Sequence, residues 1–233
     1  MGKLIAIDGL DGSGKKTQSD ILCHRIGERG IRVRELSFPV YESESSALAR
    51  LYLSGGLGGK PDDTNAYAAS MFFAADRYVT YRLDWHADAE DPETVIVANR
   101  YTTANAIHQL TKLPREMWDE FLLWLYDFEY KKLGLPEPDI VIFLEVPPEV
   151  TLSLIKTRSD ETGISRDIHE SDAAYIKACH AAAVYAADRL GWHTIKCCRT
   201  NIDGQPVMRS RDEIAADVER AIAGRHIISG FGL

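Results

Sequence analysis

The amino-acid sequence indicates an α/β protein of three layers, with a five-stranded parallel sheet flanked by helices. Short β-rich runs alternate along the chain with longer stretches of helical pattern, as in folds whose helices cover both faces of a sheet. Several runs are apolar throughout instead of alternating, which is typical of parallel strands buried on both faces. Strands are expected at residues 4–8, 31–38, 94–99, 139–146 and 193–197.

Helical stretches fill the intervals between these runs. The helix after the fourth strand is expected to begin at the pair Pro147-Pro148, because a missing N–H costs little in the first helical turn. Two connections are expected on the surface, the glycine-rich "SGGLGGKPDD" (54–63) and the acidic "HADAEDPE" (86–93). Helices are expected at residues 15–28, 44–54, 64–87, 101–111, 115–133, 148–158, 171–190 and 210–223.

Length and composition limit the class of protein. The 233 residues, 45% of them hydrophobic, suit one large domain or two small ones, and we expect a single domain over 1–233. The net charge of −8 argues against a nucleic-acid partner, which would require a clustered basic surface. No apolar run approaches the roughly 18 residues of a membrane helix, so no membrane partner is expected. The four cysteines form no C-x-x-C pair and indicate free thiols in a cytoplasmic protein without a signal peptide.

The stretch "GLDGSGKKTQ" (9–18) fits a phosphate-binding loop. The pattern G-x-x-x-x-G-K-[ST] is met by Gly9, Gly14 and Lys15, and the stretch follows a strand and opens a helix, as the motif requires. Glycines allow backbone N–H groups to turn inward around phosphate oxygens, and the helix N-terminus adds a positive dipole end. Lys15 would reach the outer phosphates. The alternative is a glycine-rich turn with two solvated lysines.

Lys16 stands where the pattern has a hydroxyl residue that ligates Mg²⁺, and Thr17 follows one place late. A lysine in the first helical turn opposes the helix dipole unless an anion lies nearby, so Lys16 favours an anionic ligand while removing a metal ligand. Because Mg²⁺ keeps several waters, carboxylates could supply the missing protein oxygen. Asp11 is a candidate, and Asp8 is either a second candidate or a turn carboxylate bound to backbone N–H groups.

Six segments that run in order from residue 4 to about residue 190 resemble the thymidylate kinase family of P-loop nucleoside monophosphate kinases. They are "IAIDGLDGSGKKTQ", "SFPVY" (37–41), "FFAADRY" (72–78), "VIVANRYTTANAIHQ" (95–109), "PDIVIFLEVPPEV" (138–150) and "SRDIHE" (165–170). The resemblance implies a P-loop NTPase fold with a short lid at about 158–171. It also implies transfer of the γ-phosphoryl group of ATP to dTMP, with Mg²⁺, in a homodimer.

The resemblance assigns roles to residues. Lys15, Arg100, Arg166 and Asp11 would be catalytic, with Asp11 and Glu170 holding the metal. The ATP site would comprise Gly9, Leu10, Asp11, Gly12, Ser13, Gly14, Lys15, Lys16, Thr17, Gln18 and Arg158. The dTMP site would comprise Asp11, Phe38, Tyr41, Phe73, Arg77, Arg100, Asn105 and His108.

Within the dTMP site the side chains make chemical sense. Arg100 would hold the acceptor phosphate, since a guanidinium fork matches phosphate oxygens, and Tyr41 could add a hydroxyl. Phe73 would stack on the pyrimidine, Arg77 would donate to a base carbonyl, and Asn105 would pair with the imide edge. Phe38 would wall the pocket. The alternative for the two phenylalanines is core packing, and for the two arginines a surface ion pair.

The lid is expected to supply catalytic positive charge, because Gly12 lies where some members of the family carry an arginine. Arg166 is the first candidate and Arg158 the second, with Asp167 and Glu170 orienting the lid or helping to hold the metal. The alternative for this stretch is a polar surface loop, and a phosphate-closing lid has the same composition.

The chain departs from the family pattern at several positions. Lys16 replaces the hydroxyl residue, Asn99 the aspartate of "DRY", and Val40 the arginine of "FPRY". Ala104 and His108 replace a serine and a tyrosine, and that tyrosine lies near the sugar and helps to reject a 2′-hydroxyl. We expect Lys16 to neutralise phosphate charge in place of the lost metal ligand. Two other functions are open: a kinase for dUMP or another pyrimidine monophosphate, and a nucleotide-binding protein without kinase activity.

Overall fold

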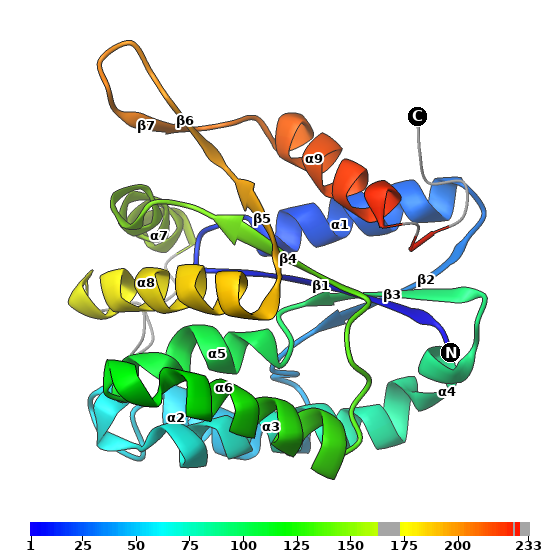
Figure 1. Ribbon diagram of the computed structural model, residues 1–233, viewed down its shortest axis with the longest axis horizontal. Coiled ribbons are helices and arrows are strands. Elements are labelled where there is room, and N and C mark those ends of the chain that lie inside the picture. Colours follow the sequence, from blue (N-terminus) through cyan, green and yellow to red (C-terminus); the bar gives the residue numbers. More distant parts are fainter. Residues whose placement is uncertain (163–172, 226, 229–233) are drawn as a thin grey trace.

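The computed structural model describes residues 1–162, 173–225 and 227–228 (Figure 1). Its centre is a five-stranded sheet of order β2-β3-β1-β4-β5. All neighbouring strands run parallel, which confirms the predicted five-stranded parallel sheet flanked by helices. The strands are β1 (Lys3–Gly9), β2 (Arg32–Ser37), β3 (Thr94–Asn99), β4 (Ile140–Glu145) and β5 (His193–Lys196).

One face of the sheet is covered by two helices, α1 (Lys15–Glu28) and α9 (Arg211–Gly224). Successive side chains of a strand point to opposite faces, so Ile5 and Ile7 pack with Ile26 of α1 on this side. Leu4 and Ala6 belong to the core on the opposite side. The central strand is therefore apolar on both faces, which accounts for its continuous apolar run.

The other helices are α2 (Ala47–Leu53), α3 (Ala66–Thr80), α4 (His86–Glu90), α5 (Thr103–Gln109), α6 (Trp118–Tyr126), α7 (Pro148–Thr162) and α8 (Ala173–Leu190). Figure 1 shows α5 against the face of the sheet opposite α1 and α9, with α3 and α6 outside it. Helix α5 contacts β1, α3, α6 and α8, so it links the sheet to the outer helices.

Several expected helices are broken by tighter or wider turns. The expected helix 64–87 consists of α3, a π-helical turn at Tyr81–Trp85, and α4. The stretch 86–93, predicted to be a solvated loop, contains α4 instead, because Trp85 and Ala89 are buried and hold this segment against the core. A second π-helical turn, Asp127–Lys132, follows α6 within the expected helix 115–133. Short 3₁₀ turns lie at Glu44–Ser46, Pro61–Asp63, Leu110–Lys112 and Arg115–Met117.

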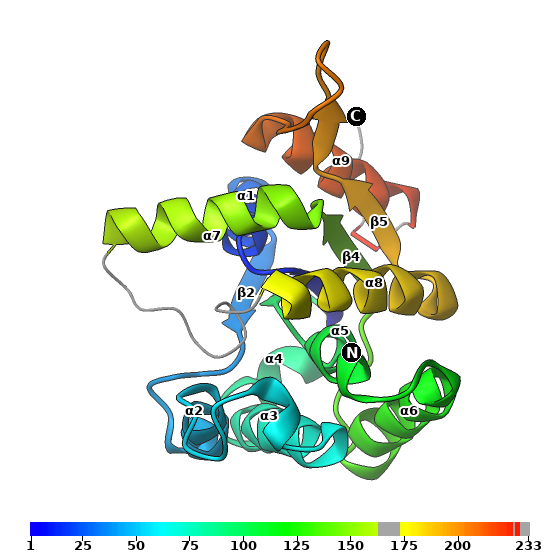
Figure 2. The same ribbon diagram turned by 90° about the vertical axis from the view of Figure 1, so that its left-hand side faces the viewer.

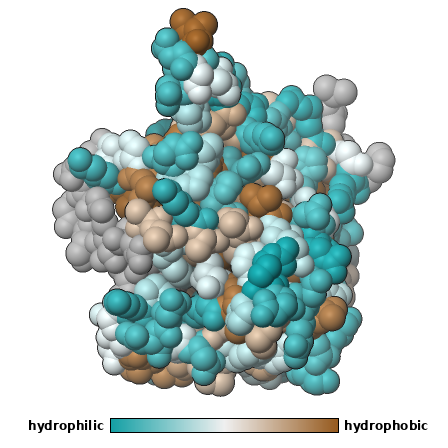
Figure 3. All heavy atoms as spheres, turned by 60° about the vertical axis from the view of Figure 1, so that its left-hand side comes forward, coloured by the Kyte–Doolittle hydropathy of each residue, from teal (hydrophilic) through white to brown (hydrophobic). Residues whose placement is uncertain are grey.

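A two-stranded hairpin, β6 (Cys198–Thr200) and β7 (Pro206–Met208), follows β5 and was not predicted. It projects from the body of the molecule (Figures 1 and 2), and Figure 3 shows its tip standing clear of the surface. Ile202 in its turn is fully exposed. Strands of three residues are too short to show a recognisable alternation, so the pattern could not indicate them.

The carboxyl ends of β1, β2 and β3 lie at one edge of the sheet, because neighbouring strands are parallel and in register. Ligands of open α/β sheets bind at this edge, beside the strands whose connections diverge. The segments that follow these strands begin at Leu10, Phe38 and Arg100, and each carries residues of the expected site.

Candidate active site

The glycine-rich loop connects the end of β1 to the start of α1, as the motif predicts. Gly14 caps the helix with φ 87°, a left-handed conformation that favours glycine. Gly12 has φ 79°, and a Cβ atom there would lie 3.2 Å from the Cβ of Leu154 in α7. The loop is therefore closed from behind by α7, and its conformation allows no side chain at Gly12 without strain.

Lys15 is folded into this loop and is only 7% exposed. Its Nζ donates to the carbonyl oxygens of Gly9 (3.0 Å) and Leu10 (2.7 Å) and lies 3.5 Å from Asp11 Oδ1. Burial, and then the nearby charge of Arg100, lower the pKa of Lys15 from 10.5 to about 8. Its positive charge is thus incompletely compensated, and a bound phosphate would stabilise it.

The rest of the loop also suits an anion. The hydroxyl of Ser13 is buried and has no hydrogen-bond partner among the described residues. A buried polar group without a partner is costly, and a ligand oxygen would satisfy it. Together with the helix N-terminus and buried Lys15, this orphan hydroxyl indicates that the loop fits the phosphates of a nucleotide.

Lys16 points away from the loop. Its Nζ donates to Asp20 of α1 and to Glu35 of β2, the latter at 3.3 Å, and its side chain is 61% exposed. The hydrogen bond to Asp20 is the largest effect and raises the pKa of Lys16. Lys16 therefore has two carboxylate partners of its own, and its expected contact with phosphate stays a prediction.

Gln18 and Asp8 have hydrogen-bond partners within the protein. The Gln18 amide donates to the carbonyl of Arg211 (3.1 Å) and so joins α1 to α9. Asp8 is fully buried, and its carboxylate accepts from the N–H of Gly9 (2.8 Å) and the hydroxyl of Thr103 (2.6 Å). Asp8 was expected to be either a metal ligand or a turn carboxylate, and these hydrogen bonds are those of a turn carboxylate. Thr17 is partly exposed in the first turn of α1.

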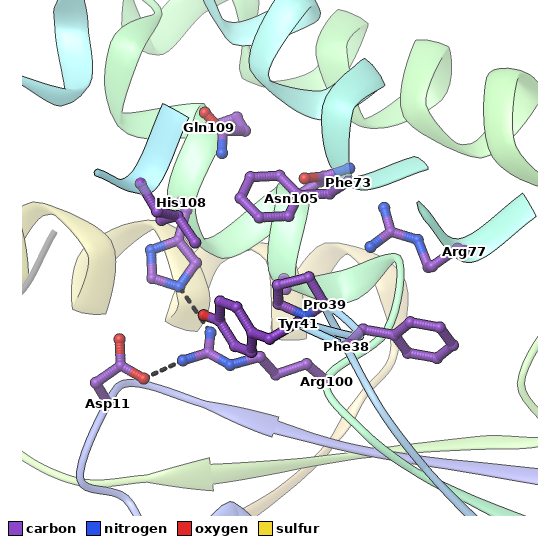
Figure 4. Close-up of a pocket in the computed structure, with 12 residues that line it drawn as sticks. Asp11, Phe38, Pro39, Tyr41, Phe73, Arg77, Arg100, Asn105, His108 and Gln109 are labelled. Carbon is purple, nitrogen blue, oxygen red and sulfur yellow. Dashed lines mark hydrogen bonds and ion pairs between the residues drawn. The ribbon is translucent and has the colours of Figure 1, made fainter. Parts of the chain in front are cut away.

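An open cavity lies beside the loop, with about 480 Å³ of space when the solvent at its mouth is included (Figure 4). The cavity brings together all eight residues that the resemblance assigned to the dTMP site, namely Asp11, Phe38, Tyr41, Phe73, Arg77, Arg100, Asn105 and His108. Pro39, Leu53, Ala104 and Gln109 complete its lining.

Arg100 joins the cavity to the phosphate loop. It is one residue beyond β3, and its φ of 65° is the only positive value outside glycine in the described residues. A residue other than glycine is strained in this conformation, and such residues cluster at functional sites. The guanidinium donates to Asp11 Oδ1 and lies 3.3 Å from His108 Nε2. Figure 4 shows Arg100 beside Asp11 and below His108, with a dashed line to each, at one end of the cavity.

His108 is held in one tautomer by its neighbours. Arginine has no acceptor, so His108 Nε2 must accept from Arg100 and the ring proton lies on Nδ1. Nδ1 lies 3.6 Å from the Cys179 Sγ, and the ring stacks on Tyr175, which donates to the His108 carbonyl. Helix α8 thus positions His108, the cavity residue that stands where the family pattern has a tyrosine.

The opposite end of the cavity is apolar with a polar floor. Phe38 packs on Trp85 and Tyr101, and Phe73 packs edge-on against Tyr52 at a centroid distance of 6.0 Å. Both phenylalanines line the cavity and also pack against other rings, so core packing does not remove them from the cavity wall, and the stacking of Phe73 on a pyrimidine stays a prediction. The peptide bond between Phe38 and Pro39 is cis.

Arg77 forms a buried ion pair, and not the surface ion pair that was the alternative. Its Nε and Nη2 donate to the two oxygens of Glu129 at 2.7 and 2.6 Å, and both residues are almost fully buried. Burial alone would lower the pKa of Arg77, but the charge and hydrogen bonds of Glu129 outweigh it and the pKa rises. Breaking such a pair by removing one partner typically costs about 3–5 kcal/mol.

Two polar residues of this region were missed in the sequence. Gln109 lines the cavity, is 1% exposed, and has an amide without a hydrogen-bond partner among the described residues. It lies four residues after Asn105, so helical spacing puts both on one face and was a usable signal. Glu129 lies four residues after the buried Leu125, and a carboxylate on the apolar stripe of a helix was the corresponding signal.

The comparisons with known proteins identify the family. The family model described as thymidylate kinase matches residues 7–200. A thymidylate kinase of Mycobacterium tuberculosis is 31% identical over 186 residues, covering 78% of this chain and 84% of the relative. The chain belongs to the thymidylate kinase family. A thymidylate kinase of Caenorhabditis elegans is 28% identical over 158 residues, covering 64% of this chain and 65% of the relative.

A solved structure shows the same fold as this member of the thymidylate kinase family. The thymidylate kinase of Candida albicans superposes with a TM-score of 0.67, covering 97% of this chain and 93% of that one. Its sequence is only 18% identical, so this match supports the P-loop α/β fold and no finer property.

Two departures from the thymidylate kinase pattern have structural partners in this chain. Asn99 donates through Nδ2 to the Ser37 hydroxyl at 3.0 Å, which ties the ends of β3 and β2 together. The N–H of Val40 donates to Asp76 of α3 at 2.8 Å, so the segment 37–41 is fixed through its backbone.

Part of the thymidylate kinase site is not covered by the structure. Arg166, Asp167 and Glu170 lie outside the described residues, and so does the side chain of Arg158 in α7. Within the described ranges, no group of three or more His, Cys, Asp or Glu side chains is arranged to hold a metal ion. No helix in the described part of the chain is both long enough and apolar enough to cross a membrane.

Proposed function

We propose that this chain transfers the γ-phosphoryl group of ATP to dTMP, giving ADP and dTDP. Membership of the thymidylate kinase family supports the reaction. The observation that carries the proposal is the position of Asp11 between two cations. Its Oδ1 accepts from Arg100 of the cavity and lies 3.5 Å from Lys15 of the loop. Donor and acceptor phosphates would therefore meet at this side chain.

The reaction needs positioning and positive charge more than covalent chemistry from the protein. An oxygen of the dTMP phosphate forms the new bond to the γ-phosphorus, and the bond to the departing ADP oxygen breaks. Because a phosphate monoester has its second pKa near 6, the attacking oxygen is already ionised at neutral pH and no general base is required. Lys15 and Arg100 would hold the two phosphates against their mutual repulsion, with Asp11 keeping both cations in place.

The cavity would bind dTMP with its phosphate at Arg100 and its base at the far end. Tyr41, which is 52% exposed at the cavity mouth, would add a hydroxyl to the phosphate. The ring of Phe73 would stack on the pyrimidine. Arg77 and Asn105 would meet its polar edge, and Phe38 would close the wall behind it. His108 would face the sugar, since it lies 3.3 Å from Arg100 and one helical turn after Asn105 on α5.

Magnesium would reduce the repulsion between the phosphates. In this chain the metal position would receive no hydroxyl from Lys16, whose ammonium is bound to Asp20 and Glu35. Asp11 is a partly buried carboxylate within the loop, and we propose that it holds the metal together with Glu170, phosphate oxygens and water. The lid, at about 158–171, would supply Arg166 and Arg158 as further positive charge.

We also propose that the chain forms one domain that assembles as a homodimer. Helices α2 and α3 pack together and carry large apolar side chains that are 36–47% exposed, namely Leu48, Leu51, Met71, Tyr78 and Val79. Exposed apolar side chains on two packed helices favour association with a second copy. Light scattering at micromolar concentration should give twice the mass of one 26.0 kDa chain.

A coupled assay of ADP release tests the function. The purified chain is supplied with ATP and Mg²⁺ and with dTMP, dUMP, dCMP or no acceptor. Turnover with dTMP well above the background without acceptor is the expected result. Some turnover of dUMP is also expected, because a missing methyl group changes discrimination by only about 1–3 kcal/mol. A chain that turns over none of the acceptors would be a nucleotide-binding protein without kinase activity.

A further inference from the structure

Glu129 does not line the cavity but binds two residues that do. It lies in the π-helical turn Asp127–Lys132 and has no exposed surface. One of its oxygens accepts from Arg77 Nη2 at 2.6 Å and from Asn105 Nδ2 at 2.9 Å, and the other accepts from Arg77 Nε at 2.7 Å. A single buried carboxylate therefore connects α3, which carries Arg77, with α5, which carries Asn105.

These bonds fix the direction of the Asn105 amide. Its Nδ2 donates both to Glu129 and to the backbone carbonyl of Ser70 at 3.2 Å. Both partners are acceptors only, so a flipped amide would place Oδ1 against two oxygens in a buried site. Oδ1 is consequently the atom that Asn105 offers to the cavity, and it can only accept a hydrogen bond.

The same carboxylate fixes the direction of the Arg77 fork. With Nε and Nη2 on Glu129, the nitrogen left to meet a ligand is Nη1, which can only donate. Figure 4 shows Arg77 and Asn105 at the end of the cavity away from Asp11, together with Phe73. The floor of the cavity thus presents one acceptor and one donor with fixed identities.

We propose that Glu129 is a positioning residue: by orienting Arg77 and Asn105, it makes the cavity bind a pyrimidine that has an N–H beside a carbonyl and reject cytosine. Thymine and uracil offer an N3–H donor and an O4 acceptor, which match Asn105 Oδ1 and Arg77 Nη1. Cytosine has an unprotonated N3 and an amino group at the same two positions, so both contacts would be mismatched. The proposal rests on the proposed function, because it assumes that the base lies at this end of the cavity.

Replacing Glu129 with glutamine separates positioning from packing. Glutamine has the same shape, but its amide brings an N–H₂ group to face the donors of Arg77 and Asn105. Asn105 could then reverse its amide and donate to N3 of cytosine. We expect a preference of at least about 100-fold for dTMP over dCMP in the unmodified chain, and a fall of at least about tenfold in Glu129→Gln. A purely structural role would weaken the binding of both nucleotides equally and leave their ratio unchanged.

The experiment measures equilibrium binding of dTMP and dCMP by titration calorimetry, without ATP. Glu137→Gln is the matched control, since Glu137 also accepts a side-chain hydrogen bond, from Tyr126, but is exposed and does not reach the cavity. The control should keep the full ratio. A Glu129→Gln protein that folds and keeps the full ratio would overturn the proposal.

A second pair of variants covers the case in which Glu129→Gln fails to fold. Glu129→Asp keeps the charge but withdraws the carboxylate by one methylene, and we expect an intermediate ratio; an undiminished ratio would count against the proposal. In an Asn105→Ala background, the Glu129→Asp change should alter the ratio less than in the unmodified chain, because part of its effect runs through Asn105. Equal effects in both backgrounds would contradict the role of Asn105.

The two proposals fail in different ways. Absence of dTMP turnover in the unmodified chain would refute the kinase function, whereas the dTMP-to-dCMP binding ratio would still test Glu129. Normal turnover with an unchanged ratio in the Glu129 variants would refute the positioning role alone.

Discussion

Raising the pH from 7 to 9 is expected to weaken ATP binding through the charge of Lys15. The ammonium is buried in the phosphate loop, and burial and then Arg100 lower its pKa to about 8 in the free protein. Bound phosphates would surround the same ammonium with negative charge and raise its pKa well above this value. Binding at alkaline pH must therefore be accompanied by uptake of a proton, and affinity falls as the pH rises through the pKa of the free form.

The size of the effect follows from the pKa. With a pKa of about 8, about 90% of the free protein is protonated at Lys15 at pH 7 and about 10% at pH 9. The apparent affinity follows this fraction, so the dissociation constant should rise about tenfold, which is about 1.4 kcal/mol. ATP itself contributes little, because its terminal phosphate is already ionised above a pKa near 6.

The sign for stability is the opposite of the sign for binding. The unfolded chain binds its Lys15 proton up to about pH 10.5, whereas the folded chain releases it near pH 8. Between these values the unfolded state binds more protons, so the contribution of Lys15 makes the folded state more stable as the pH rises. Binding and stability should therefore change in opposite directions over this range.

Titration calorimetry in two buffers of different ionisation enthalpy measures the proton uptake directly. At pH 8, where Lys15 is about half protonated, about half a proton should be taken up per ATP. Lys15→Met should abolish the uptake. Lys112 is the matched control, because burial also lowers its pKa to about 8 but it is bound to Tyr52 and Thr64, so Lys112→Met should keep the uptake. A dissociation constant that stays flat from pH 7 to 9 would refute the reasoning.

Three other predictions follow from single side chains. Lys16→Thr would return a hydroxyl to the metal-ligand position of the loop and should lower the Mg²⁺ concentration needed for half-maximal activity; unchanged activity and Mg²⁺ dependence would make Lys16 a bystander. His108→Tyr would place the family's ring beside the sugar and should raise kcat/KM for dTMP relative to its ribonucleotide, and an unaltered ratio would remove His108 from sugar selection. Trp85→Ala would leave a large cavity beside Phe38 and should lower the free energy of unfolding by about 3–5 kcal/mol in urea denaturation, whereas a loss below about 1 kcal/mol would contradict its role in the core.

The phosphate loop and the sheet could be predicted from the sequence because their signals are local. Gly14 and Lys15 lie next to each other, and the conformation of the loop depends on residues within a few positions of them. The apolar runs of β1 and β4 report burial on both faces, and α1 begins and ends at its expected residues. The resemblance added the eight residues expected to bind dTMP, and all of them line one cavity.

The partners of these side chains could not be predicted, because they come from distant parts of the chain. Glu129 meets Arg77 across 52 residues, and Lys16 is turned towards Glu35 of a neighbouring strand. The pKa of Lys15 depends on burial and on Arg100, neither of which its own segment contains. Periodicity and turn chemistry record what the backbone does locally. The tertiary structure determines which charges face each other. It also determines the free energy needed to bury them, because folding removes them from water.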